Sequence, residues 1–264
     1  MKGLKPHLLA GVVAAGVLLP FAPLLLWAFS ERWFYPDLLP EQWGLRAWAY
    51  VTGTAGPQMA EALFHSVRIA AATAILSVAV GVPAGRALGL YAFRFKDLVS
   101  IVLLLPVIVP PLCVAMGLHL WLIRLGLAET FAGVVLVHLS FCLPYSVFVM
   151  WGVFSNYDPD FEHQARSLGA SSAKVVMRVM LPLVFPGILV AALFSFLLSW
   201  SQYLSTLIIG GGKLATLPIL LFALMGSGDR PVAAAVGIVF VVPALVALLA
   251  GARVLGRRSV AGVW

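Results

Sequence analysis

Residues 157–182 read YDPDFEHQARSLGASSAKVVMRVMLP, a polar stretch inside a chain that is otherwise made of apolar runs. Asp158 can cap a helix, and the proline after it falls at the first helical position, where proline is tolerated. Gly169 suits the left-handed conformation that commonly ends a helix. Ser171 can cap a second helix, which we expect to end before Pro182. The stretch therefore predicts two short helices joined at a glycine.

The second of these helices has an apolar face beside two basic side chains. Val175, Val176 and Val179 recur at helical spacing, with Lys174 and Arg178 next to them. The residues alone leave two interpretations open. The stretch is either an amphipathic helix on the membrane surface or a rigid elbow presented to a cytoplasmic partner.

The composition around this stretch indicates an all-α integral membrane protein. The 264 residues are 62% hydrophobic and 10% charged, with a mean hydropathy of +1.04. Soluble domains carry about 25% charged residues, and a bilayer core needs about 20 apolar residues per helix. Most of the surface is therefore expected to face lipid. The net charge is +7. In a membrane protein the placement of the basic residues among the loops matters more than their sum, so no nucleic-acid partner is expected.

Six spans are expected within one transmembrane domain covering residues 1–264. They lie at about 8–29, 64–90, 98–122, 131–154, 184–209 and 231–254. The first follows Met-Lys-Gly-Leu-Lys and is longer than the apolar part of a signal peptide, so a retained anchor is expected rather than a cleaved leader.

The basic residues give an orientation for these spans. If both termini are cytoplasmic, 11 of the 17 basic residues fall inside and 6 fall outside. The inner ones are Lys2, Lys5, Arg86, Arg94, Lys96, Arg166, Lys174, Arg178, Arg253, Arg257 and Arg258. The positive-inside rule then predicts that N- and C-termini are both inside, with residues 157–182 in the cytoplasm.

Polar residues in the fifth span are candidates for a solute path. Hydroxyl and amide groups at that depth usually face the bundle interior, although hydrogen bonding between helices is the alternative. The candidates are Trp200, Ser201, Gln202, Tyr203 and Thr206.

No acidic residue lies deep in any expected span, and no metal or cofactor is expected. His119 and His138 have no companion ligands at a suitable spacing, which favours packing or hydrogen bonding. Cys113 and Cys142 both lie in apolar runs and are interpreted as free thiols.

The spacing around Gly169 matches a family pattern. The stretch resembles the EAA loop of permease subunits in bacterial ABC importers, Glu-Ala-Ala-x3-Gly-x9-Ile-x-Leu-Pro. Nine residues separate Gly169 from Val179, which is followed by Met180 and Leu181-Pro182, while His163-Gln164-Ala165 stand where the family has Glu-Ala-Ala. Residues 105–118 and 194–219 resemble the polyamine, iron and thiamine branch of that family.

The resemblance implies a transport subunit of the bacterial inner membrane that forms half of the path for a small solute. The chain has no nucleotide-binding G-x4-GK-[ST] motif, so the implied partners are a separate cytoplasmic ATPase, a second, different permease subunit and an extracytoplasmic solute-binding protein. The residues implied to dock with the ATPase are Glu162, His163, Gln164, Ala165, Arg166, Gly169, Ala170, Leu181 and Pro182.

Two departures from the family pattern affect the site. His163 replaces the usual glutamate, so we expect Glu162 or the second permease to supply the carboxylate contact. Ser201 and Gln202 stand where many polyamine permeases carry an acid, which disfavours a polyamine.

Two other classes are the alternatives. A membrane-embedded enzyme, such as an intramembrane protease, would need a nucleophile motif or paired acids in the spans. A secondary transporter would usually show an internal repeat or an ion-coupling acid. Neither signal is present in the sequence.

Overall fold

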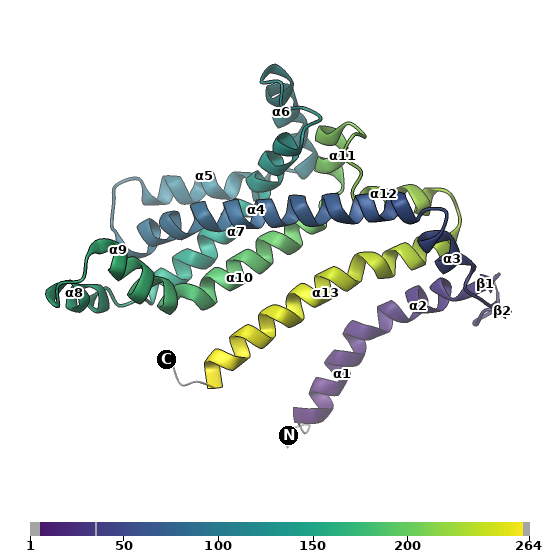
Figure 1. Ribbon diagram of the computed structural model, residues 1–264, viewed down its shortest axis with the longest axis horizontal. Helices are drawn as coiled ribbons and strands as arrows, with labels where there is room; N and C mark the ends of the chain where they lie inside the picture. The colour runs from purple at the N-terminus through teal and green to yellow at the C-terminus, as the bar shows by residue number, and fades with distance from the viewer. Residues whose placement is uncertain (1–5, 35, 261–264) are drawn as a thin grey trace. The chain divides into compact units, whose positions relative to one another are not determined.

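The apolar runs fold as helices in the computed structural model, which describes residues 6–34 and 36–260 (Figure 1). The chain divides into two compact units, one formed by the residues up to 63 with 217–243, the other by 64–216 with the residues from 244 onward. Lys2 and Lys5, which contribute to the predicted orientation, lie outside the described residues.

The first unit begins with a helix that prolines interrupt. Helix α1 (Pro6–Leu18) gives way to a 3-10 turn, η1 (Leu19–Phe21), and then to α2 (Ala22–Ala28). Strands β1 (Ser30–Arg32) and β2 (Gln42–Trp43) pair antiparallel, with an irregularity in the register, and α3 (Arg46–Thr52) follows. The short helix α12 (Leu217–Gly226) was not predicted.

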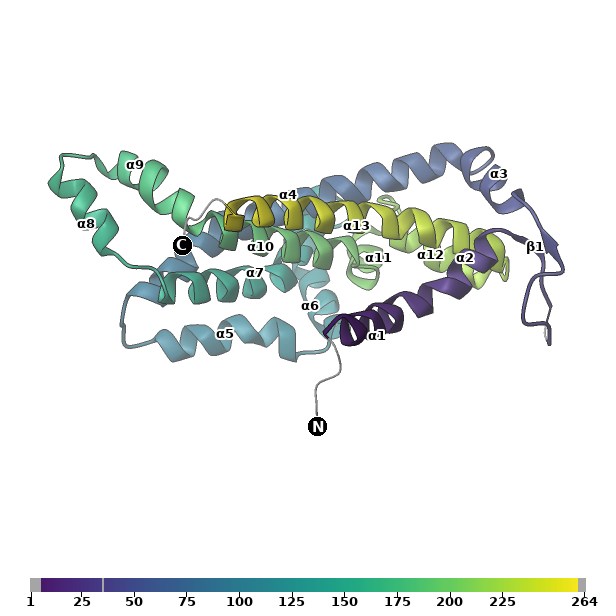
Figure 2. The same ribbon diagram turned by 90° about the horizontal axis from the view of Figure 1, so that it is seen from below.

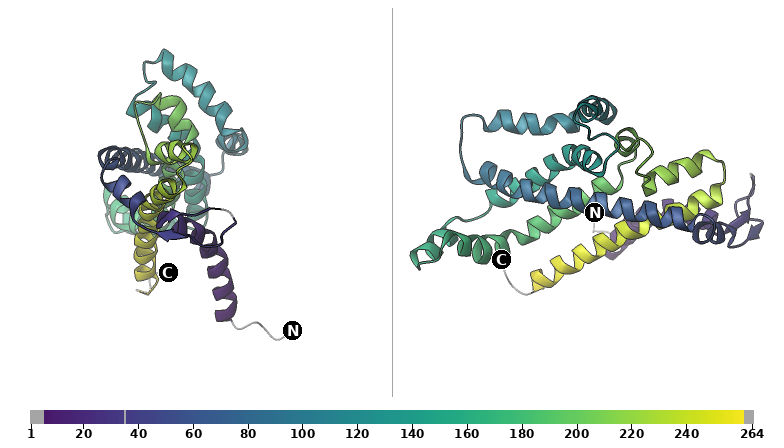
Figure 3. Two further views of the ribbon diagram at one scale, coloured as in Figure 1. Left: turned by 90° about the vertical axis from the view of Figure 1, so that its right-hand side faces the viewer. Right: turned by 45° about the horizontal axis from the view of Figure 1, so that its top comes forward.

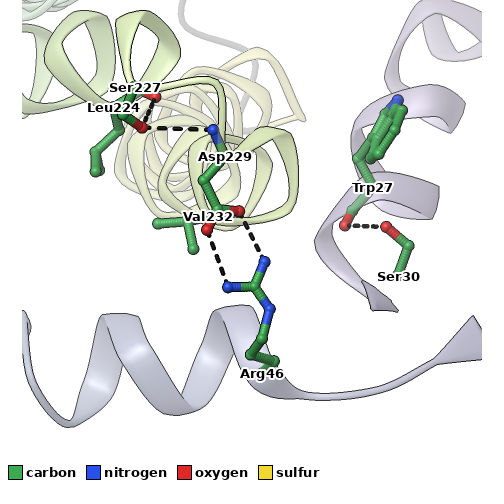
Figure 4. A network of polar contacts seen from close by, with 7 residues as sticks. All are labelled: Trp27, Ser30, Arg46, Leu224, Ser227, Asp229 and Val232. Atoms are coloured by element: carbon green, nitrogen blue, oxygen red, sulfur yellow. Dashed lines mark hydrogen bonds and ion pairs between the residues drawn. The ribbon is translucent and has the colours of Figure 1, made fainter. Parts of the chain in front are cut away.

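A bidentate ion pair stabilises this unit (Figure 4). The guanidinium of Arg46 donates to both carboxylate oxygens of Asp229, at 2.9 and 2.8 Å. Asp229 also accepts the backbone N–H of Val232 at 3.3 Å, in the first turn of α13 (Arg230–Val260). The hydrogen bond from Arg46 holds the pKa of Asp229 below its usual value, so the pair is ionised at neutral pH.

The second unit contains the longest helices. It comprises most of α4 (Gly56–Leu90), then α5 (Lys96–Ile108), α6 (Pro111–Arg124), α7 (Phe131–Ser155), α8 (Asp160–Ser167), α9 (Ser172–Val175), the π-helix η2 (Val176–Met180), α10 (Leu181–Trp200) and α11 (Leu204–Gly210). Helices α7 and α10 run side by side, with α8 and α9 projecting beyond them (Figure 2).

Close contact between α4 and α7 depends on three glycines one turn apart. A Cβ atom at Gly81, Gly85 or Gly89 would lie within 2.6 Å of Ser146, Met150 or Phe154 side-chain atoms. Residues without side chains let helix backbones approach closely in membranes.

The third expected span is two helices rather than one. The axes of α5 and α6 differ by 102° at a break around Val109 and Pro110 (Figure 3). Val109 is extended, as residues before proline usually are, and Pro110 and Pro111 supply no N–H to continue the helix. Among the described residues, five helices are therefore long and apolar enough to cross a membrane, or six if this bent pair is one span.

The fifth expected span also differs from its prediction. Its helix ends at Trp200, residues 201–203 are irregular, and α11 is a separate short helix. The expectation that the preceding helix stops before Pro182 is wrong, since residues 172–200 are helical without a gap. Pro182 falls in the first turn of α10, directly after the π-helix.

Candidate functional site: the elbow between α7 and α10

The polar stretch between α7 and α10 forms a helix–glycine–helix elbow, which we define as residues 157–182. Its first helix is present as α8, as predicted. The carboxylate of Asp158 accepts the backbone N–H of Asp160 at 2.9 Å, at the start of the helix. Asp160 and Glu162 place negative charge in the first turn, where the helix dipole favours it.

Gly169 ends this helix in the left-handed conformation, as predicted. Its φ is +83°. The N–H of Ala170 donates to the carbonyl of Ala165 at 3.0 Å, and that of Gly169 to the carbonyl of Arg166 at 2.9 Å. These two bonds form a Schellman motif, which satisfies the last carbonyls of the helix. The turn at Gly169 is thus set by hydrogen bonds within the elbow.

The second helical part of the elbow, α9 followed by η2, contains one turn of π-helix. Ser171 takes the extended N-cap conformation, but its side chain makes no capping hydrogen bond. At the end of η2 the N–H of Leu181 donates to the carbonyl of Val176, five residues back. This wider turn carries the helix across Pro182, whose ring would otherwise meet the carbonyl four residues earlier.

Most of the predicted docking residues lie on the surface of the elbow. His163, Gln164, Arg166, Gly169 and Pro182 are exposed, while Ala165, Ala170 and Leu181 are half-buried. A shallow depression on α8 is lined by Asp160, His163, Gln164, Ser167 and Leu168. Leu168 itself is 89% exposed, a high value for a large apolar side chain.

Glu162 is the exception, because its side chain points into the protein. The residue is only 3% exposed. Its two carboxylate oxygens each lie 2.9 Å from a guanidinium nitrogen of Arg86 in α4. The hydroxyl of Tyr157 donates to the same carboxylate at 3.1 Å, and Arg166 lies 3.6 Å from it.

Arg86 and Tyr157 were not predicted from the sequence as partners of Glu162. Arg86 stands near the C-terminal end of the second expected span, within the apolar run GVPAGRAL. An arginine in such a run usually has a polar partner, and that signal indicates that a partner exists without identifying Glu162.

The carboxylate of this cluster is ionised and the phenol is neutral. Burial raises the pKa of Glu162, but the hydrogen bonds and charge of Arg86 outweigh it, so the pKa lies below its ordinary value. Burial and the neighbouring carboxylate raise the pKa of Tyr157 to about 12. At neutral pH Tyr157 is therefore a hydrogen-bond donor to a charged acceptor, which is among the stronger kinds of hydrogen bond.

The residues proposed for a solute path gather where α10 ends. Trp200 and Thr206 are buried, Gln202 and Tyr203 are half-buried, and Ser201 is exposed. His138 of α7 is hydrogen-bonded to Ser199 at 2.8 Å and to Thr206 at 2.9 Å, so its interpretation as a hydrogen-bonding residue is confirmed. A closely packed polar cluster results, lined by Ser66, Ile69, His138, Ser199, Trp200, Gln202, Thr206 and Thr216.

The contact between His138 and Ser199 is not a catalytic dyad. A serine nucleophile needs a base that a third group orients, usually a carboxylate. The second ring nitrogen of His138 pairs with the hydroxyl of Thr206 instead. Nor do the described residues bring three His, Cys, Asp or Glu side chains together in a group that could hold a metal.

Comparison with known proteins shows the family of the chain. Residues 81–260 match the family described as binding-protein-dependent transport system inner membrane component. The chain belongs to this family. The match covers the elbow, Arg86 and the polar cluster around His138, except for the part of α4 that carries Ser66 and Ile69.

Relatives of the permease come from several transport systems. It is 32% identical over 255 residues to the molybdenum transport system permease protein ModB of Mycobacterium tuberculosis, covering 90% of this chain and 91% of that protein. It is 29% identical to the spermidine/putrescine transport system permease protein PotC of Haemophilus influenzae, covering 75% of this chain and 77% of the other.

A solved structure shows the same fold as the permease. A chain of a bacterial ABC transporter that imports the acidic polysaccharide alginate aligns with a TM-score of 0.72 at 16% identity, over 94% of both chains. A second structure of an alginate transporter, in complex with a pentasaccharide-bound periplasmic protein, aligns with a TM-score of 0.67 at 15% identity, over 93% of this chain and 91% of that one.

Family membership decides between the alternatives left open by the sequence. The permease is a transport subunit of a binding-protein-dependent ABC importer in the inner membrane, and ATP hydrolysis belongs to a separate subunit. It is therefore neither an intramembrane protease nor a secondary transporter.

Proposed function

We propose that the permease crosses the inner membrane six times as one transmembrane domain, with both termini in the cytoplasm and the bent pair α5–α6 acting as one span. The distribution of basic residues supports this orientation. The number of spans is supported by the five helices of spanning length among the described residues, with the bent pair as a sixth. In this arrangement the elbow lies on the cytoplasmic side.

The elbow docks with the cytoplasmic ATPase. The observation that carries this proposal is the exposure of Phe161 in α8 and of Leu168 directly after it, in a stretch of mostly polar residues that lies outside the helices of spanning length. Removing large apolar side chains from water is a main driving force of protein–protein association. The hydrogen-bonded turn at Gly169 holds Leu168 in place before the partner arrives, which lowers the ordering cost of binding.

The carboxylate that the family usually carries at the position of His163 comes from the second permease subunit. Of the two expected sources, Glu162 has both oxygens paired with Arg86 within this chain. His163 and Gln164 carry no carboxylate that could reach a partner. A second, different permease that carries the acid completes the contact, which favours a heterodimer.

An extracytoplasmic binding protein delivers a small solute to a path that includes the polar cluster at the end of α10. One of the similar alginate transporters has been solved with a periplasmic protein bound. The proposed path residues offer hydroxyl, amide and imidazole groups and no carboxylate. This chemistry suits a neutral or anionic solute better than a polyamine cation.

Docking of the elbow can be tested with a matched pair of variants. Leu168→Asp changes a side chain that is 89% exposed, and Leu38→Asp changes one that is 90% exposed in the loop between β1 and β2. Neither removes a packed contact, so both proteins should fold. We expect Leu168→Asp to lose co-purifying ATPase and Leu38→Asp to retain it at wild-type stoichiometry. Full retention by Leu168→Asp would contradict docking through the elbow.

A further inference from the structure

Arg86 lies where four segments of the chain meet. Its guanidinium pairs with Glu162 of α8, contacts the sulfur of Met180 in η2, and lies 6.0 Å from the centre of the Phe154 ring in α7. The residue itself belongs to α4. Met180 and Phe154 are members of a buried apolar cluster that also includes Val184. Arg86 therefore connects the elbow to the packed core of the helices around it.

The contact between Arg86 and Glu162 is directional. Nη2 of Arg86 donates a hydrogen bond to one carboxylate oxygen of Glu162 at 2.9 Å, and Nη1 lies 2.9 Å from the other oxygen. Contacts to both oxygens fix the distance and the orientation of the guanidinium relative to the carboxylate. The side chain of Glu162 is 4% exposed and that of Arg86 is 23% exposed, so salt screens the pair less than a surface pair. Among the ion pairs of the described residues, this is the one that joins the elbow to α4.

Helix α4 extends from this contact to the polar cluster around His138. Ser66 and Ile69 of α4 line that cluster. Twenty residues separate Ser66 from Arg86, which is about 30 Å of continuous helix at 1.5 Å per residue. A displacement of the elbow that moves α4 as a rigid rod would therefore reach the residues proposed for the solute path.

We propose that Arg86 and Glu162 are positioning residues that lock α8 to the inner end of α4, so that movement of the docked elbow is transmitted along α4 to the polar cluster. This inference rests on the proposed docking of the elbow with the ATPase. Glu162 serves the contact within the chain, and the ATPase contacts the exposed face of the elbow around Leu168. The ion pair is needed for coupling ATP hydrolysis to solute import, and not for assembly of the permease with the ATPase.

The test uses the full importer with its ATPase, second permease and binding protein, reconstituted in proteoliposomes. Glu162→Gln keeps the shape of the side chain and removes its charge. We expect the ATPase to co-purify with this variant as with the wild type, while the solute imported per ATP hydrolysed falls between about 5- and 150-fold, the usual range of coupling between two sites. Unchanged transport per ATP in Glu162→Gln would overturn the inference.

A double variant separates coupling from stability. Arg86→Met leaves the Glu162 carboxylate buried without its partner and should lower the melting temperature of the complex. Arg86→Met combined with Glu162→Leu removes both charges, and such apolar replacements commonly restore stability. We expect the double variant to regain its melting temperature but remain uncoupled, because an apolar contact has no directional preference. Recovery of coupling along with stability would show a merely structural role.

A distance measurement tests the rigid connection directly. Spin labels at Ala87 and Ser167, both exposed in this chain, are placed in a protein with Cys113 and Cys142 replaced by alanine. We expect the distance between the labels to stay constant between nucleotide-free and ATP-bound importer, and to change in Glu162→Gln. A change in the wild-type connection on ATP binding would overturn the inference.

The two proposals fail in different ways. If Leu168→Asp retains the ATPase, docking through the elbow is wrong and the ion pair has no movement to transmit. If Leu168→Asp loses the ATPase and Glu162→Gln transports normally per ATP, only the role of the ion pair is wrong.

Discussion

Backbone conformation distinguishes Gly169 from Gly152, although both have free space around them. A Cβ atom at either position would meet nothing within 4 Å. Of these two glycines, Gly169 alone has a positive φ, +83°. The left-handed conformation costs a residue with a Cβ atom about 1–2 kcal/mol. The two sites therefore differ in backbone strain and not in packing.

We expect Gly169→Ala to destabilise the elbow by about 1–2 kcal/mol, for that reason. The matched change Gly152→Ala, within α7, should leave stability the same or slightly higher, since alanine is the better helix former. Thermal unfolding of the two purified variants in detergent measures the difference. Equal melting temperatures for both variants would contradict the conformational argument.

A pH dependence follows from the environment of Glu162. Its pKa in the folded protein lies below the ordinary value of 4.5, because the hydrogen bonds and charge of Arg86 outweigh the effect of burial. The ion pair therefore stabilises the folded state fully above about pH 4.5, and this contribution is lost as the pH falls through the lowered pKa. We expect the stability difference between wild type and Glu162→Gln to shrink below pH 4.5 in unfolding measurements across a pH series. A difference that grows on acidification would contradict the assignment.

At the scale of elements, Gly81, Gly85 and Gly89 form a glycine seam on α4 that decides how closely α4 and α7 approach. Gly85 is its central residue, and a Cβ atom there would lie 2.4 Å from the Cβ of Met150 and 2.7 Å from its backbone carbonyl carbon. Backbone cannot move aside as a flexible side chain can. The two helices must separate to admit even a methyl group.

We predict that Gly85→Ala lowers the free energy of unfolding by about 1–3 kcal/mol, the usual cost of overpacking. Gly117→Ala in α6, where nothing lies within 4 Å of the added atom, is the matched control and should not lower it. Thermal unfolding in detergent compares the two. A loss of stability in the control as large as in Gly85→Ala would show that the seam has no special role.

Periodic and capping signals were sufficient to predict local structure. Asp158 and Gly169 mark the ends of α8 because capping depends on residues next to one another in sequence. The bend at Val109 was visible only as a group of prolines, since its size depends on the packing of neighbouring segments. The π-helix before Pro182 was not predicted, because it differs from an α-helix only by one extra residue in a turn.

The site was predictable in part for the same reason. The spacing from Gly169 to Leu181-Pro182 lies within one segment, so the elbow could be found from sequence. The partnership of Arg86 with Glu162 joins residues 76 positions apart, and a single sequence holds no record of such pairs. The inward direction of Glu162 therefore emerged only from the structure.

At the scale of the whole molecule, topology is the property most open to test. We predict that Leu38→Cys, in the loop after the first span, reacts with a membrane-impermeant maleimide in intact cells, and that Phe93→Cys, between α4 and α5, reacts only after permeabilisation. Both side chains are exposed, and Cys113 and Cys142 are first replaced by alanine. The reverse pattern would invert the orientation of every span.

The π-helix at residues 176–180 affects the direction in which α8 and α9 project from α10. One residue more or less in a helical turn rotates everything beyond it by about 100° and shifts it by about 1.5 Å along the axis. Substitutions in this turn would keep the direction of α8 and α9, whereas deletion of one residue would swing Leu168 to another side of the bundle while α10 stays intact. The number of residues in this turn therefore sets the direction in which Leu168 points. Under the proposed docking, a change in that number would require a different ATPase surface.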